Sequence, residues 1–142
     1  MGNDIFGADE DTLEAAALRA AAERGWTLAC LEFQTEGTLL ARLSGTAHPA
    51  FLAGNGLTVQ EEPLAEAVEK SRKQFKATAA LGVACDVKED EQKVTLVLIT
   101  PHGQEERLLT YGGHPGNLPR WAVNMALDWL RRTALKAENN VK

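Results

Sequence analysis

The residues best placed for chemistry lie in the stretch "CLEFQTEG", residues 30–37, which joins a predicted strand to a predicted helix. Turns of this kind often carry the binding or catalytic groups of α/β proteins. The stretch offers a thiol at Cys30, carboxylates at Glu32 and Glu36, and a hydroxyl at Thr35. A hydroxyl is a weak nucleophile unless a base activates it. For Thr35 we therefore expect the N-cap position of the following helix, which threonine often occupies. For Glu32 we expect a structural hydrogen bond.

The cysteines and histidines are the other residues that could bind a metal or act as a base. Cys30 and Cys85 each lie in an apolar run, which predicts small buried side chains in a reducing compartment. His48, His102 and His114 each stand beside proline or glycine, so we expect them in loops. A metal site needs closely spaced ligands. We therefore expect no metal and no cofactor.

Composition limits the classes of function. The chain has 142 residues, enough for one domain with a buried core, and its net charge is −5. The basic residues are scattered, which disfavours nucleic-acid binding. No apolar run approaches the roughly 18 residues of a membrane span. The acidic start lacks the basic and apolar regions of a signal peptide. We expect a cytoplasmic protein that binds neither nucleic acid nor membrane.

The pattern of apolar residues predicts the elements that position these groups. Residues 1–10 are expected to form a flexible leader, 11–136 a single α/β domain, and 137–142 a flexible tail. Ser71 is expected on the solvent side of its helix, and Met125 within the apolar stripe of the last helix. Helices alternating with strands predict a sheet covered on both faces, and a final hairpin makes that sheet mixed. The predicted helices are 12–24, 36–44, 63–77 and 119–135, and the predicted strands are 26–32, 50–59, 78–87, 93–100 and 105–111.

Several segments together resemble the CinA carboxy-terminal domain, the nicotinamide-nucleotide amidase family. "GWTLACLEFQTEGTLLARLSG" is similar to the family pattern T-L-A-x-A-E-S-C-T-G-G-x-L-x-x-x-L, and "NLPRWAVNMALDWLRR" is similar to its closing helix. The resemblance covers roughly residues 10–135. It implies a three-layer α/β/α fold with a mixed sheet of about five strands. It also implies hydrolysis of the carboxamide of nicotinamide mononucleotide by a serine, a lysine and glycine-rich loops, with release of ammonia. The matched residues are Thr27, Leu28, Ala29, Glu32, Thr35, Gly37, Leu40 and Leu43.

The chain departs from this family where the chemistry would occur. The serine position is Phe33 and the cysteine after it is Gln34. The first glycine of the family's pair is Glu36, whose carboxylate we expect to satisfy the N–H groups of the helix. The lysine segment is missing, with no lysine between Val59 and Lys70. The second glycine-rich loop aligns with the acidic residues 86–91.

Three interpretations follow from the resemblance. The favoured one is a degenerate CinA-like domain without catalytic residues, which acts as an interaction or regulatory protein and forms a homo-oligomer or binds another protein. The second is an amidase with a rerouted nucleophile, Thr35 or Cys30, and a rerouted base, Lys70 or Lys73. The third is a domain whose degenerate family pocket binds a small apolar or nucleoside-like molecule. The residues predicted to line that pocket are Glu32, Phe33, Gln34, Thr35, Glu36 and Gly37.

Overall fold

The computed structural model describes residues 12–57, 60–88 and 91–139. The helices and strands follow one another in the predicted order, and one short 3₁₀ turn precedes the last helix. The predicted leader lies outside the described residues, as do residues 140–142, while residues 137–139 belong to the last helix. The elements are α1 (Leu13–Glu23), β1 (Leu28–Phe33), α2 (Thr38–Gly45), β2 (Phe51–Leu57), α3 (Leu64–Gln74), β3 (Ala79–Lys88), β4 (Glu91–Thr100), β5 (Gly103–Thr110), η1 (Pro115–Asn117) and α4 (Leu118–Asn139).

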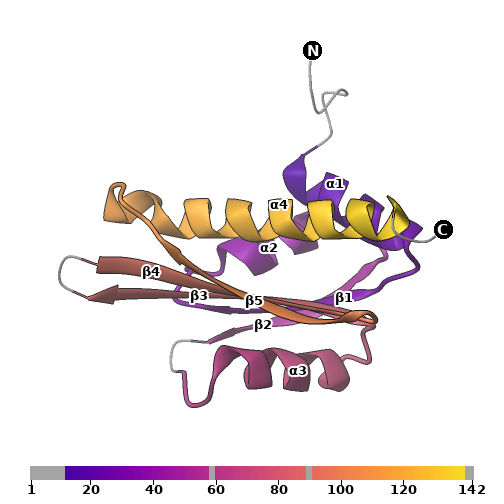
Figure 1. Cartoon of the computed structure of the whole chain (residues 1–142), viewed down its shortest axis with the longest axis horizontal. Helices are drawn as coiled ribbons and strands as arrows, with labels where there is room; N and C mark the ends of the chain where they lie inside the picture. The colour runs from indigo at the N-terminus through magenta and orange to yellow at the C-terminus, as the bar shows by residue number, and fades with distance from the viewer. Residues whose placement is uncertain (1–11, 58–59, 89–90, 140–142) are drawn as a thin grey trace, which may run out of the picture.

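The five strands form one mixed sheet in the order β2-β1-β3-β4-β5. Strand β1 runs parallel to β2 and β3, while β4 is antiparallel to both β3 and β5. Helices α1, α2 and α4 cover one face of the sheet and α3 covers the other (Figure 1). The three-layer fold with a mixed sheet is confirmed. Strand β3 lies in the middle because its apolar run can be buried on both faces.

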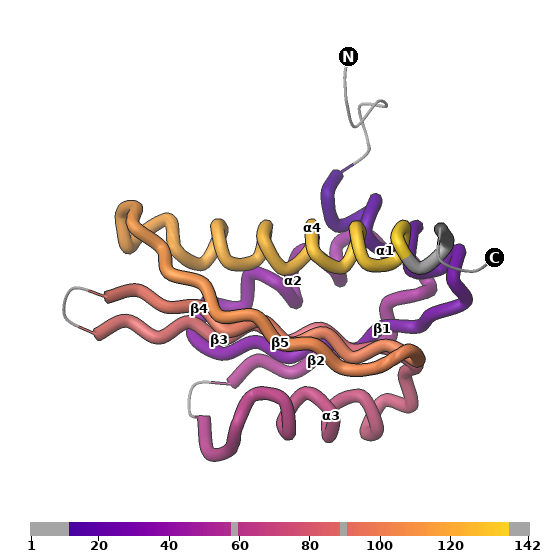
Figure 2. Tube along the Cα trace, in the orientation of Figure 1, coloured from indigo at the N-terminus to yellow at the C-terminus, as the bar shows by residue number. Residues whose placement is uncertain are grey.

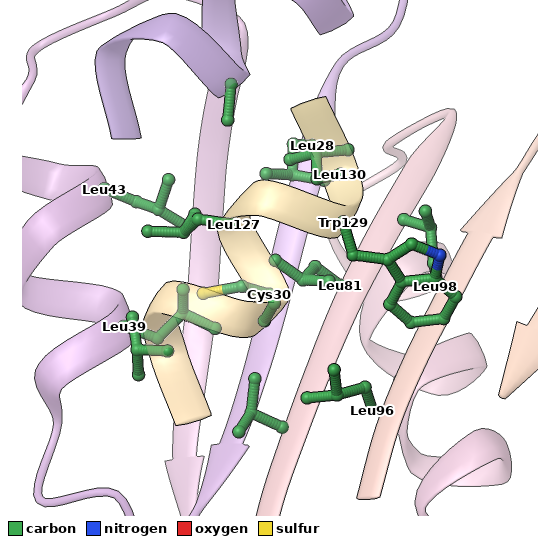
Figure 3. Close-up of a cluster of buried hydrophobic side chains, with 14 of the residues drawn as sticks. Leu28, Cys30, Leu39, Leu43, Leu81, Leu96, Leu98, Leu127, Trp129 and Leu130 are labelled. Atoms are coloured by element: carbon green, nitrogen blue, oxygen red, sulfur yellow. The ribbon is translucent and has the colours of Figure 1, made fainter. Parts of the chain in front are cut away.

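Successive side chains of β1 point to opposite faces of the sheet, so this strand contributes to two separate core clusters. Leu28 and Cys30 belong to the larger cluster, beneath α4, whereas Ala29 and Leu31 belong to the smaller cluster beneath α3. Figure 3 shows leucines of three strands and two helices meeting in the larger cluster. The tube of Figure 2 shows how α4 runs across the whole width of that face.

Met125 does not belong to the buried stripe of α4, so that prediction is wrong. The side chain is 38% exposed, whereas Ala126 and Leu130 are completely buried. An α-helix turns by about 100° per residue. The buried face centres between Ala126 and Leu127, so Met125 points away from the sheet.

Two glycines allow close packing, one between α3 and the sheet and one between two neighbouring strands. A Cβ atom at Gly82 of β3 would overlap the side chain of Val68, so α3 packs directly against the middle strand. A Cβ atom at Gly54 of β2 would overlap the sulfur of Cys30. The register between β1 and β2 also shifts, which leaves Leu52 as an extra residue in β2. Strand β2 therefore combines a close backbone approach at Gly54 with a bulge at Leu52.

Within the described ranges, no helix combines the length and the apolar character that a bilayer span requires.

Candidate functional site

The turn between β1 and α2 has an unusual backbone. Gln34, Glu36 and Gly37 have φ angles of 62°, 58° and 74°. This left-handed conformation costs a residue other than glycine about 1–2 kcal/mol. Glu36, in the position of the family's first glycine, therefore keeps a glycine-like backbone. Strain of this kind is found at functional turns, which makes this turn a candidate site.

Glu32 holds the beginning of α2. Its side chain is 1% exposed, and its two carboxylate oxygens accept hydrogen bonds from the backbone N–H groups of Leu39 (2.9 Å) and Leu40 (2.7 Å). The hydroxyl of Thr35 donates a third hydrogen bond to the same carboxylate. The structural hydrogen bond expected for Glu32 is confirmed, and it acts as the cap of the helix.

The N-cap role predicted for Thr35 is wrong, because the N-cap residue is Gly37. Two residues in the left-handed conformation separate Thr35 from the helix, so its hydroxyl does not reach the helical N–H groups. Glu32 meets those groups instead from the preceding strand. A charged carboxylate with two oxygens is also a stronger acceptor than a hydroxyl.

The N-terminus of α2 has no spare donor in its first turn. Besides the two N–H groups bound by Glu32, Thr38 donates to the carbonyl of Thr35 at 3.0 Å and Ala41 to that of Gly37 at 3.0 Å. A helix N-terminus binds anions through such donors when they lack partners. The cap role expected for Glu36 is also wrong: Glu36 precedes the helix and its side chain is exposed.

The six residues predicted to line one pocket lie in different environments. Glu32 and Thr35 are buried, while Gln34 and Gly37 are exposed in the turn. Phe33 projects to the opposite face of the sheet, where it packs on the smaller core cluster. There it lines a cavity of about 380 Å³ together with Leu31, Gly56, Leu57, Gln60, Glu61, Glu62, Leu64 and Ala67. Glu36 lines a separate, shallow cleft of about 470 Å³ beside α4.

The structure does not bring together the residues of a rerouted amidase. Cys30 is completely buried, and burial, together with the nearby charge of Glu32, raises the pKa of its thiol. Lys70 and Lys73 are exposed on α3, which covers the opposite face of the sheet. Lys70 is bound to Glu62 at 2.7 Å, and this hydrogen bond raises the pKa of the lysine. The sheet therefore separates the thiol from both amines.

Ser71 is 2% exposed, so its predicted solvent position is wrong. Its hydroxyl donates to the carbonyl of Cys30 at 3.5 Å and accepts from the side chain of Asn55 at 3.4 Å. The spacing from Leu64 and Ala67 to Ser71 follows one helical face, and this signal could have identified it as buried.

The remaining candidate residues lie largely as expected. Cys85 is buried with a free thiol, and burial raises its pKa to about 11. The three histidines lie in loops or turns: the Nδ1 atoms of His48 and His114 accept backbone hydrogen bonds, and His102 is exposed between β4 and β5. Residues 86–88 and Glu91, aligned with a glycine-rich loop of the family, are strand residues of β3 and β4.

The sequence did not predict a third cavity, which is larger than the two described above. It lies between the last turns of α4 and the strands β4 and β5, and its volume is about 710 Å³. Its lining combines residues from three distant parts of the chain, namely Trp26, the β4–β5 hairpin with His102 and Arg107, and the end of α4 with Trp129.

Comparison with known proteins gives a uniform result for the fold. No protein-family model matches the sequence, and no curated protein matches it. Among solved structures, a CinA superfamily protein from Klebsiella pneumoniae is similar over 87% of this chain and 96% of its own, with a TM-score of 0.76 and 18% sequence identity. A CinA superfamily protein from Escherichia coli (90% and 92% covered, TM-score 0.71, 17% identity) and a competence/damage-inducible protein from Agrobacterium tumefaciens (92% and 97%, 0.63, 14%) are also similar. At these low sequence identities, the similarity shows a shared fold. The fold of this chain is CinA-like.

Proposed function

We propose that this chain, whose fold is CinA-like, is a degenerate CinA-type protein that does not hydrolyse amides and acts in the cytoplasm as an interaction or regulatory protein. The observation that carries the proposal is Phe33. It stands where the resemblance places the nucleophilic serine, and its ring packs on the core beneath α3.

The groups around Phe33 support the same proposal. Amide hydrolysis requires an activated nucleophile and donors for the developing oxyanion. The hydroxyl of Thr35 already donates to Glu32, and the N–H groups that open α2 already have acceptors. A substrate would have to displace these internal bonds before any catalytic step.

An interaction role is supported by apolar side chains on the two edge strands. Leu52 and Leu57 of β2 are 43% and 41% exposed, and Leu108 of β5 is 77% exposed. Edge strands present unpaired backbone groups that can bind another strand. These features favour association with a second copy of the chain or with a homologous protein.

The direct test is release of ammonia from nicotinamide mononucleotide at high protein concentration, with a serine-containing amidase of this family as the positive control. We expect no release above the blank, from either the wild-type chain or a Phe33→Ser variant, because the lysine segment is also missing. Clear turnover by the wild-type chain would overturn the proposal. If that turnover disappeared in Thr35→Ala, the rerouted amidase would be the correct interpretation.

Self-association is tested by light scattering after gel filtration over a range of concentrations. We expect a mass above that of the 15.4 kDa monomer, and we expect Leu52→Glu to reduce it. If the measured mass equals that of one chain at every concentration, self-association is excluded and the partner would be a different protein.

The cavity beneath Phe33 favours a second candidate, a small-molecule binding domain. Its apolar walls come from Leu31, Leu57 and Leu64, and its carboxylates from Glu61 and Glu62. Those carboxylates would repel a phosphate, so the ligand would be a nucleoside-like molecule without a phosphate group. Calorimetry with nicotinamide riboside and nicotinamide mononucleotide tests this. Absence of heat with both compounds would count against binding.

A further inference from the structure

The cavity of about 710 Å³ lies at the end of the sheet opposite to the turn of residues 34–37. We call it the α4–β5 groove and define it by Trp26, Leu98, Thr100, His102, Gly103, Gln104, Glu105, Arg107, Trp129, Arg132, Thr133 and Lys136. Ala80 of β3 pairs with Ile99 of β4, next to the start of β1, so the β4–β5 turn lies at the amino end of β1. The turn of residues 34–37 follows the carboxyl end of the same strand.

The floor of the groove is aromatic and apolar. Trp26, Leu98 and Trp129 are 4%, 2% and 3% exposed. The ring of His102 meets the ring of Trp26 edge to face, with centroids 6.1 Å apart. A volume of about 710 Å³ lies within the roughly 300–1,000 Å³ that small-molecule sites occupy. The groove can therefore accommodate a flat ring system.

Trp129 adds a polar group without a partner. Its indole Nε1 is buried, and no hydrogen-bond acceptor meets it among the residues that the structure describes. In Figure 3 this nitrogen lies on the Leu98 side of the ring, and both residues line the groove. A buried donor without an acceptor is unfavourable, so a ligand oxygen that reached it would form a bond that the free protein does not make.

Positive charge surrounds this floor. Arg107, Arg132 and Lys136 line the groove, and Glu105 is the carboxylate in the same lining. The guanidinium of Arg107 lies 4.7 Å above the centre of the Trp129 ring. The Nε atom of Arg132 forms an ion pair with the carboxylate of Asp128 at 2.7 Å. Asp128 itself does not line the groove. The lining thus has three basic residues and one acidic residue, whereas the chain as a whole has a net charge of −5.

We propose that the α4–β5 groove binds a small planar aromatic acid. His102 and Arg107 cover the rings of Trp26 and Trp129 in the structure, so the ligand ring reaches these tryptophans when the two exposed side chains move, and its carboxylate faces the three cations. The exposed Arg107 side chain moves aside, so that a carboxylate oxygen accepts a hydrogen bond from the Nε1–H of Trp129. An inorganic anion could not use the apolar floor, and a neutral ring could not use the cations.

The test is an NMR titration of the full chain with 1-naphthoate, read at the indole N–H signals. The chain has three tryptophans. Trp121 packs on Tyr111 outside the groove, at 4.7 Å between ring centroids, and serves as the internal control. Single Trp→Phe variants assign the signals. We expect the Trp129 signal to move to lower field on titration to about 1 mM, while the Trp121 signal stays in place.

Matched ligands and variants separate the contributions. The neutral amide, 1-naphthamide, should bind about tenfold more weakly, and inorganic phosphate should leave the Trp129 signal unmoved. Lys136→Gln should weaken binding of 1-naphthoate about threefold, as expected for an exposed ion pair, and Glu105→Gln should strengthen it. Lys93→Gln, an exposed lysine near the opposite end of β4, should change nothing.

The proposal is overturned if 1-naphthoate leaves the Trp129 signal in place, or if the amide binds as tightly as the acid. Equal effects of Lys136→Gln and Lys93→Gln would also contradict it. The result does not depend on the proposed function, because the groove and the turn of residues 34–37 lie at opposite ends of β1. Failure in the ammonia assay and failure in this titration are therefore distinguishable.

Discussion

Replacing Glu32 tests the central contact of the β1–α2 turn. In Glu32→Ala, the N–H groups of Leu39 and Leu40 and the hydroxyl of Thr35 lose their acceptor. The Leu39 bond is buried, and an orphaned buried donor costs about 1–3 kcal/mol. The Leu40 bond is partly exposed, so water can replace part of it. Removing a buried carboxylate also recovers some desolvation free energy. We expect a net loss of about 3 kcal/mol.

The loss is measured by urea unfolding, with an unchanged m-value as the sign that the unfolded state is the same. For a domain of this size, about 3 kcal/mol corresponds to a fall of about 9 °C in Tm. Glu32→Gln keeps one acceptor oxygen and should lose about half as much. Hydrogen exchange should accelerate at the amides of Leu39 and Leu40 before it does in the central strands.

Glu36→Ala is the matched control, because the structure places Glu36 before the helix and exposed. Its unfolding free energy should stay within about 0.5 kcal/mol of the wild-type value. The reasoning is refuted if Glu32→Ala costs less than about 1 kcal/mol, or if Glu36→Ala costs as much as Glu32→Ala.

Two further predictions concern the core. Gly82→Ala should destabilise the protein by about 1–3 kcal/mol because the added Cβ overlaps the side chain of Val68. In urea unfolding, the double variant with Val68→Ala should be less destabilised than the sum of the two single changes. Strict additivity would contradict the overlap. Burial raises the pKa of Cys85 to about 11 and also raises that of Cys30. The thiols of the unfolded chain ionise near pH 8.5–9, whereas the buried thiols of the folded chain stay protonated. The free energy of unfolding should therefore fall as pH rises from about 9 towards 11, by up to about 1.4 kcal/mol per pH unit for each thiol. Urea unfolding at pH 8, 9 and 10 measures this slope, and Cys85→Ala should make it shallower; an equal slope would show that Cys85 does not contribute.

The order of elements and their layers could be predicted because they depend on local patterns. The continuous apolar run predicted the strand at 78–87, which became β3, and Gly25, with a φ of 77°, follows the end of the helix predicted at 12–24. The three-layer mixed sheet followed from the alternation of helices with strands and from the resemblance.

The site could be predicted only in part, because its main contacts join residues distant in sequence. Glu32 caps a helix from seven and eight positions away, and the local rule for N-caps therefore selected Thr35. Ser71 was missed although its spacing from Leu64 carried the signal. The groove could not be predicted, since Trp26 and Trp129 approach it only after the sheet has assembled.

The position of α4 has a consequence for synthesis of the protein. This helix is the last element of the described chain, yet it supplies much of the larger core cluster, including Leu127, Trp129 and Leu130. While the ribosome still holds α4, only α1 and α2 cover that apolar face of the sheet, and the part beneath α4 stays exposed. Nascent chains of this protein should therefore depend on chaperones until α4 emerges, and premature termination before residue 118 should leave products that aggregate.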